Sequence, residues 1–142
     1  KHVLVLEGGQ SFGKSYYLNY LCPKSLEKYL YTNLGVGRDE RVKLAKAIII
    51  NIEELDVMGK YDINAIKAII SQISINERLP YADKSTLLYR TCSFVASTNR
   101  AEFLSDDSGS VRWIIFSVIQ KIDFSYSKEF NIDDFWSQAY HI

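Results

Sequence analysis

The sequence predicts an α/β domain built on a mostly parallel five-stranded sheet with helices on both faces. Short apolar runs rich in Val, Ile and Leu alternate with segments of helical periodicity, which is the pattern of parallel strands joined by crossover helices. Polar or glycine-rich residues follow several of these runs, as expected at the strand ends where such sheets bind ligands. The chain of 142 residues is long enough for one domain, residues 1–142, with its own core.

The first half of the chain contains three strand candidates. Val3–Leu6 is short and apolar, and it is followed by glycines and by a helix expected from Lys14 to about residue 21. Tyr29–Thr32 is a weaker candidate, supported by aromatic and β-branched residues. The charged stretch Arg38–Lys46 is predicted as an exposed helix, and the apolar run Ala47–Ile52 as a strand.

The second half begins with the clearest helix of the chain. From Asp62 to Ile73, isoleucines recur at spacings of three and four residues and form one apolar stripe. Residues 75–90 contain a proline and scattered charges, which suits a loop or a hairpin. Cys92–Ser97 and Trp113–Val118 are expected strands, and a helix with Asn131 as its N-cap follows them.

Composition excludes several classes of protein. No apolar run approaches the roughly 18–20 residues that span a bilayer, so we expect a cytoplasmic protein without a membrane segment. The 17 basic and 17 acidic residues cancel, so any nucleic-acid contact must come from local clusters. Cys22 and Cys92 match no metal or redox spacing and are interpreted as reduced packing residues. Because the chain begins at Lys1 without Met, we expect it to be part of a longer protein.

One motif carries the strongest functional signal. The run Gly8-Gly9-Gln10-Ser11-Phe12-Gly13-Lys14-Ser15 fits G-x-x-x-x-G-K-[ST], follows an expected strand and opens an expected helix. Its backbone N–H groups favour phosphate oxygens, while Lys14 reaches the β- and γ-phosphates and Ser15 ligates Mg²⁺. We therefore predict a P-loop NTPase fold, a three-layer sandwich that binds ATP and Mg²⁺ through residues 8–15 and Tyr16.

Two carboxylates and an amide follow neighbouring strands. Glu53 and Glu54 end one strand, and we assign Glu53 to the metal shell and Glu54 to the attacking water. The alternative is a solvated acidic start to a helix. Asn99 ends another strand, where its amide can bind the γ-phosphate or hold the attacking water. The alternative there is an ordinary turn.

Basic residues in the second half suggest contacts beyond this site. Arg112 precedes the last strand, where its guanidinium could meet the γ-phosphate of a neighbouring subunit or form a surface salt bridge with Asp106 or Asp107. Four further basic residues are interleaved with Tyr81 and Tyr89, a pattern of single-stranded DNA contacts or of a plain solvated surface. These four are Lys67, Arg78, Lys84 and Arg90.

The order of these motifs resembles that of AAA+ and superfamily 3 helicase ATPases. A narrower likeness, to the virulence-associated protein E family of phages and mobile elements, covers residues 3 to about 140. It rests on Lys67–Ser71, Arg78–Tyr81, Arg90–Asn99, Glu102–Asp106 and Gly109–Trp113. The chain departs from that family in carrying Val111-Arg112 where two adjacent basic residues are common.

That resemblance implies a sheet of order 5-1-4-3-2, with Glu54 as the catalytic carboxylate, Asn99 as a sensor and Arg112 as an arginine acting in trans. It also implies an ATP-hydrolysing, helicase-type motor in DNA replication, with residues 76–90 near single-stranded DNA. A homo-oligomer such as a hexameric ring, and a fused or partner primase, are further expectations.

Two other functions stay open at the level of the sequence. A P-loop kinase for small molecules would need an acceptor site and an arginine-rich lid, for which Arg38 and Arg41 are candidates. A nucleotide-dependent switch without turnover is the second alternative, since Glu53 stands where Asp is more usual.

Overall fold

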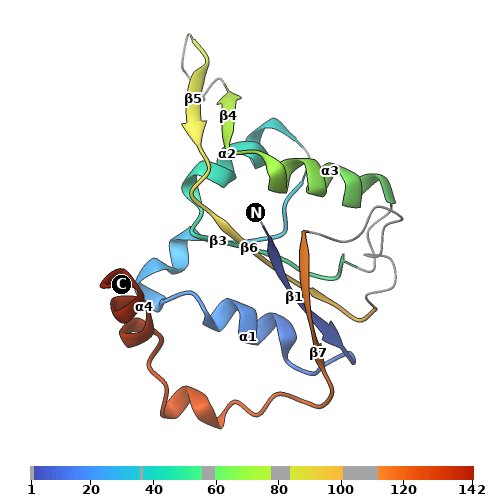
Figure 1. The fold of residues 1–142 in the computed structure, drawn as a ribbon, viewed down its shortest axis with the longest axis vertical. Coiled ribbons are helices and arrows are strands. Elements are labelled where there is room, and N and C mark those ends of the chain that lie inside the picture. The colour runs from blue at the N-terminus through green and yellow to red at the C-terminus, as the bar shows by residue number, and fades with distance from the viewer. Residues whose placement is uncertain (1, 36, 56–59, 78–83, 101–111) are drawn as a thin grey trace.

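The computed structural model describes residues 2–35, 37–55, 60–77, 84–100 and 112–142. A five-stranded sheet forms its centre (Figure 1). Its strands are β1 (Val3–Gly8), β2 (Leu30–Thr32), β3 (Ile49–Ile52), β6 (Ser93–Thr98) and β7 (Trp113–Val118). They lie in the order β2-β3-β6-β1-β7, and each pairing between them is parallel. Counted along the chain as first to fifth, the strands are therefore ordered 2-3-4-1-5, and the predicted α/β class with a parallel five-stranded sheet is confirmed.

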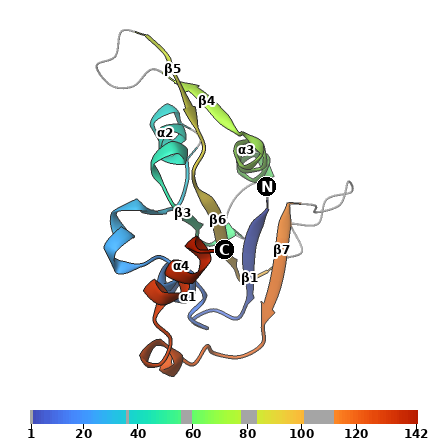
Figure 2. The same ribbon diagram turned by 60° about the vertical axis from the view of Figure 1, so that its left-hand side comes forward.

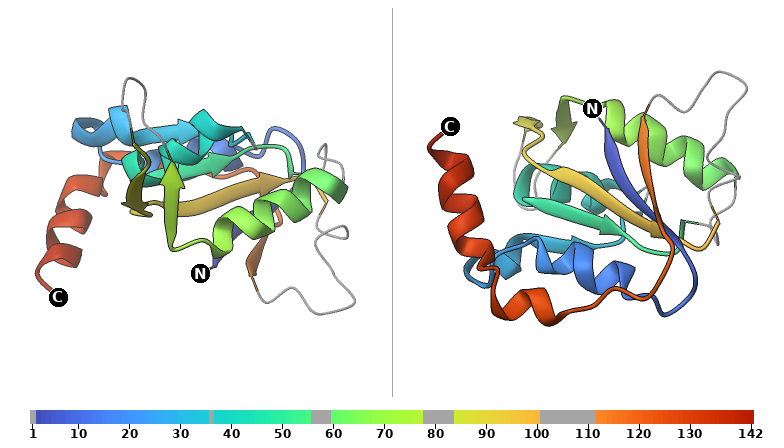
Figure 3. Two further views of the ribbon diagram at one scale, coloured as in Figure 1. Left: turned by 90° about the horizontal axis from the view of Figure 1, so that it is seen from above. Right: turned by 60° about the horizontal axis from the view of Figure 1, so that its bottom comes forward.

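Helices cover both faces of this sheet. They are α1 (Lys14–Tyr20), α2 (Arg38–Lys46), α3 (Lys60–Ser71) and α4 (Ile132–Tyr140), with 3₁₀ turns η1 (Lys24–Tyr29) and η4 (Ser125–Lys128). Figure 3 (right) shows α3 on one side of the strands, and α1 with the C-terminal segment on the other. The alternation of side chains along each strand divides the core in the same way. Val5, Ile52 and Ala96 pack with α2 and α3, whereas Leu6 and Val95 pack with α1.

The C-terminal segment returns from β7 to the α1 face (Figure 2). Asn131 caps α4, because its side chain accepts a hydrogen bond from the Asp133 N–H, as predicted. Trp136 of α4 donates from Nε1 to the Leu21 carbonyl at 2.8 Å. α4 is thereby fastened to the end of α1. No helix among the described residues is long and apolar enough to cross a bilayer.

A two-stranded antiparallel hairpin, β4 (Ser74–Glu77) and β5 (Thr86–Tyr89), projects beyond α2 and α3 (Figure 1). Of the loop or hairpin expected over residues 75–90, the described residues pair as a hairpin. The ion pair between Arg41 Nε and Glu77 Oε1, at 2.8 Å, joins the hairpin to α2. Leu87 and Tyr89 are 55% and 65% exposed, so β5 presents large apolar side chains to solvent.

Three expectations from the sequence need correction. α2 is not an exposed helix, because Val42 and Leu44 are buried beneath its charged residues. Tyr29 belongs to η1 rather than to the strand that follows it. Ile73 is 60% exposed, since α3 ends at Ser71 and the apolar stripe ends with it.

Candidate functional site

The C-terminal ends of β1, β6 and β3 lie side by side, and they enclose a cavity of about 240 Å³. The glycine-rich loop after β1, with the start of α1, forms one wall, and the end of β6 together with residues that follow β3 and β6 forms the other. The lining residues are Gln10, Ser11, Phe12, Gly13, Lys14, Ser15, Tyr16, Glu54, Ser97, Thr98 and Asn99. The fold thus brings together three segments that are far apart in sequence and that sequence reasoning had singled out separately.

Lys14 occupies the centre of this arrangement. Only 7% of the residue is exposed, and a buried ammonium is costly unless acceptors surround it. Its Nζ donates to the carbonyls of Gly8 and Gly9, both at 2.7 Å, and to Asn99 Oδ1 at 3.2 Å. The ammonium therefore joins the loop to the end of β6, where it can meet an anion that enters the cavity.

Two glycines give the loop its shape. Gly8 has φ of 155°, and a Cβ there would lie 2.4 Å from the Val118 carbonyl oxygen of β7. Gly13 has φ of 87°, and a Cβ there would lie 2.6 Å from the ring of Phe124. Any other residue would clash at both positions, so the loop can wrap its backbone tightly only because they are glycine.

Ser15 faces a partner that sequence reasoning missed. Its Oγ lies 3.1 Å from Oγ of Ser97 on β6, and Ser97 is only 3% exposed. A serine in an apolar strand gives no signal by itself. Its position immediately before Thr98-Asn99 was the available hint, because the penultimate residue of a strand can still face the helix that follows the loop.

Glu53 and Glu54, which follow β3, differ in their position relative to the cavity. The register of β3 with β6 pairs Asn51 with Val95 and Ile52 with Ala96, and Glu53 follows directly after the end of β3. Glu53 Oε1 accepts a hydrogen bond from Asn51 Nδ2 at 3.4 Å. The Glu53 N–H also donates to Asn33 Oδ1 at 2.9 Å, and Glu53 is not among the residues that line the cavity.

Glu54 lines the cavity instead. Its backbone has φ of 52°, a left-handed conformation that is uncommon for residues other than glycine. This turn interrupts the alternation of the strand, which would otherwise direct consecutive side chains to opposite faces. The side chain is exposed to solvent at the mouth of the site.

The donors in this region fit Mg²⁺. Ser15, Glu53 and Glu54 offer hydroxyl and carboxylate oxygens, the ligand type that Mg²⁺ prefers. Within the described residues, no group of three or more His, Cys, Asp or Glu could hold a metal. Mg²⁺ commonly binds through one or two protein groups together with waters and substrate phosphates, so this donor set suits a metal that arrives with its ligand.

Arg112 lies far from this cavity. It precedes β7, whose first residue pairs with Val3 and whose last pairs with Gly8. The length of β1, about 17 Å at 3.3 Å per residue, therefore separates Arg112 from the loop of its own chain. Arg112 is exposed, and its Nε donates to Ser71 Oγ at 3.0 Å. The two aspartates weighed as its salt-bridge partners lie outside the described residues.

Of the four basic residues expected near DNA, the structure describes Lys67, Lys84 and Arg90. Arg90 donates from Nη1 to the Ile70 carbonyl at 2.9 Å and lies 5.4 Å from the centroid of the Phe94 ring. It thus holds the base of the hairpin against α3. Lys84 is exposed just before β5, and Lys67 is half-buried on α3. Arg78 and Tyr81 lie outside the described residues.

Both cysteines are buried free thiols, as predicted. Burial raises the pKa of Cys92 to about 11, and it also raises the pKa of Cys22, with a contribution from Glu27. Neither thiol is placed to act as a nucleophile or a metal ligand.

Comparison with known proteins identifies one family. The profile of the virulence-associated protein E-like domain matches residues 1–142, and no curated protein matches the chain. The A form apo structure of the NrS-1 C-terminal region is 17% identical, with a TM-score of 0.61, over 90% of this chain and 33% of that one. An apo structure of the same NrS-1 region is 14% identical, with a TM-score of 0.62 and the same two coverages of 90% and 33%.

At these identities the likeness to NrS-1 concerns the fold, and this chain spans about a third of the NrS-1 chains. The family match extends over the whole sequence and so over every wall of the cavity. This chain belongs to the family of virulence-associated protein E-like domains.

Proposed function

We propose that this domain binds ATP with Mg²⁺ and hydrolyses it, as the motor of a helicase- or primase-associated protein in phage or mobile-element DNA replication. The observation that carries the proposal is Lys14. Its ammonium is buried between the loop carbonyls and Asn99, where a β- or γ-phosphate would meet it.

The chain's own residues divide the work of hydrolysis. The glycine-rich loop and Lys14 hold the phosphates, and Ser15 supplies a hydroxyl oxygen to the metal. Bound Mg²⁺ neutralises charge that develops on the phosphate oxygens. Glu54 accepts the proton of the attacking water, and Asn99 orients that water or the γ-phosphate. Glu53, the first residue after β3, would belong to the shell of the metal.

Arg112 completes the site of a neighbouring copy in this proposal. Its distance of about 17 Å from its own loop excludes a direct role there, while its exposed guanidinium is accessible to another subunit. A homo-oligomer, such as a ring, follows from that role. The part in DNA replication rests on the family and on the projecting hairpin with its exposed Leu87 and Tyr89.

One of the two arginines considered for a kinase lid is engaged elsewhere in the structure. Arg41, a candidate residue for an arginine lid, is ion-paired with Glu77 of the hairpin. It therefore stabilises α2 against β4, away from the loop.

The test is the rate of ATP hydrolysis by the full-length protein, with and without single-stranded DNA. Replacing Glu54 by glutamine should lower kcat by about a hundredfold or more, the usual contribution of a general base, with ATP affinity retained. Glu7→Gln is the matched control, because Glu7 accepts a hydrogen bond from Ser117 on the opposite side of β1. A wild-type protein that hydrolyses no ATP under either condition would refute the motor. Phosphate transfer to a nucleoside or sugar would favour the kinase.

A further inference from the structure

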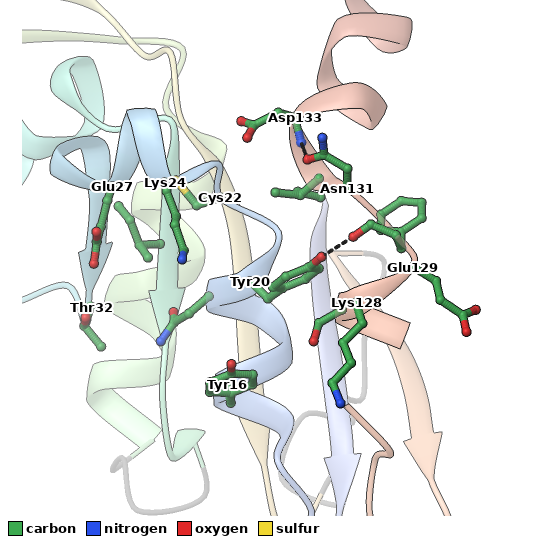
Figure 4. A pocket seen from close by; sticks show the side chains of 15 residues that line it. Tyr16, Tyr20, Cys22, Lys24, Glu27, Thr32, Lys128, Glu129, Asn131 and Asp133 are labelled. Carbon is green, nitrogen blue, oxygen red and sulfur yellow. Dashed lines mark hydrogen bonds between the residues drawn. The ribbon is translucent and has the colours of Figure 1, made fainter. Parts of the chain in front are cut away.

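A second and larger cavity, of about 890 Å³, extends along the outer side of α1 (Figure 4). Tyr16, Asn19 and Tyr20, spaced three and four residues apart on one helix face, form its floor. Figure 4 shows Lys24, Glu27 and Thr32 on one side of α1, and Lys128 and Glu129 on the other. None of the functional residues discussed above lies here except Tyr16.

Tyr16 lines both cavities. It follows Ser15 directly, and its side chain is 60% exposed. An exposed aromatic ring at the edge of a phosphate-binding loop offers a stacking surface rather than a core contact. The ring therefore marks the passage from the small cavity into the large one.

The C-terminal segment holds that ring in place. Phe124 meets Tyr16 edge to face, with centroids 4.5 Å apart and planes at 79°. Phe124 in turn covers Gly13 and contacts Tyr126, whose ring lies 5.6 Å from that of Tyr20. The contact with Phe124 restricts the Tyr16 ring before any ligand arrives, which lowers the entropic cost of stacking.

The two ends of the small cavity are lined by different groups. Its far side carries Glu54 and Asn99, the groups suited to the terminal phosphate, whereas Tyr16 lies on the first turn of α1. A triphosphate on the loop, with its γ-phosphate toward Lys14 and Asn99, directs its nucleoside toward Tyr16.

We propose that the Tyr16 ring is the platform on which the base of the nucleotide stacks, and that the adjoining end of the large cavity receives the nucleoside. This subsite rests on the proposed function, since it requires phosphates on the loop. Every base presents a π-face, so stacking tolerates different bases. ATP and GTP are therefore expected to bind with similar affinity.

Calorimetric titration of the full-length protein with three probes tests the subsite: ATP, GTP and inorganic tripolyphosphate. Tyr16→Ala should weaken ATP and GTP about tenfold, equivalent to about 1.4 kcal/mol, and leave tripolyphosphate unchanged. Tyr16→Phe should bind all three like the wild type. Tyr140→Ala is the control, because Tyr140 is an 87% exposed aromatic residue on α4. Thermal unfolding of each variant verifies that it is folded.

The outcomes separate the two proposals. If Tyr16→Ala binds ATP as tightly as the wild type, or loses tripolyphosphate as much as ATP, the stacking platform is refuted while the phosphate site stands. A wild-type protein that binds neither ATP nor tripolyphosphate refutes the proposed function and this subsite with it.

Discussion

Replacing Ser97 by alanine removes a single hydroxyl from the wall of the site. That hydroxyl is nearly inaccessible, at 3% exposure, and lies 3.1 Å from the hydroxyl of Ser15. When the Ser15 hydroxyl donates its hydrogen bond to Ser97 Oγ, the lone pairs of Ser15 are left to face Mg²⁺. A neutral hydrogen bond of this kind contributes about 0.5–1.5 kcal/mol. The Mg²⁺ concentration for half-maximal tightening of nucleotide binding should therefore rise about two- to tenfold in Ser97→Ala.

The assay is the binding of a fluorescent ATP analogue, titrated with Mg²⁺ and repeated in EDTA. Ser97→Ala should shift the Mg²⁺ dependence and leave the affinity in EDTA unchanged, while Ser97→Thr keeps the hydroxyl and should retain the wild-type response. Ser117→Ala, which removes a hydroxyl bonded to Glu7, is the matched control. An unchanged Mg²⁺ dependence, or an equal loss of affinity in EDTA, would show that Ser97 does not orient Ser15.

Four further outcomes are expected. Lys14→Ala should weaken ATP about tenfold or more in the same binding assay, because it removes a charge-assisted contact. Gly8→Ala should lower the free energy of unfolding in urea by about 1 kcal/mol or more, since its Cβ would meet the Val118 carbonyl. Ile66→Ala, at a residue 1% exposed, should cost about 2–5 kcal/mol in the same experiment. Cys92, with a pKa of about 11, should resist maleimide at pH 8 in the native protein and react once urea unfolds it, as mass spectrometry would show. Because the folded state raises this pKa, the stability it confers should be lost as pH rises toward 11.

The central strands were predictable because they are covered on both faces. Such strands are apolar at consecutive positions, and β1 and β3 show this directly in Val3–Leu6 and Ile48–Ile50. α3 was equally clear, since its isoleucines follow the helical period and are buried against the sheet. The glycine-rich loop was found by its spacing and by the strand and helix expected on either side of it. The positive φ values at Gly8 and Gly13 explain why glycine stands at both positions.

The remaining features depend on contacts between distant segments. Ser97 meets Ser15 only because β6 lies between β1 and β3, which no local pattern reports. Arg90, one of the basic residues expected near DNA, donates to the Ile70 carbonyl 20 residues away, a contact that its local sequence does not indicate. The many charged residues of α2 made it look exposed in the sequence. Its two apolar residues, Val42 and Leu44, are nevertheless buried, and they suffice to bury one side of a short helix.

The position of Arg112 has a consequence for the stoichiometry of activity. In the proposed function, Arg112 at the N-terminal end of the strands completes a cavity at the C-terminal end in a neighbouring copy. Successive copies would then meet head to tail, in a heterologous contact that either closes into a ring or stays open. Every open assembly ends with one site that lacks its arginine, so an open dimer contains one completed site for two subunits. The fraction of sites that have their arginine then grows with each added subunit, and every site has one only when the assembly closes into a ring. Dilution should therefore lower the turnover per subunit as well as the total rate.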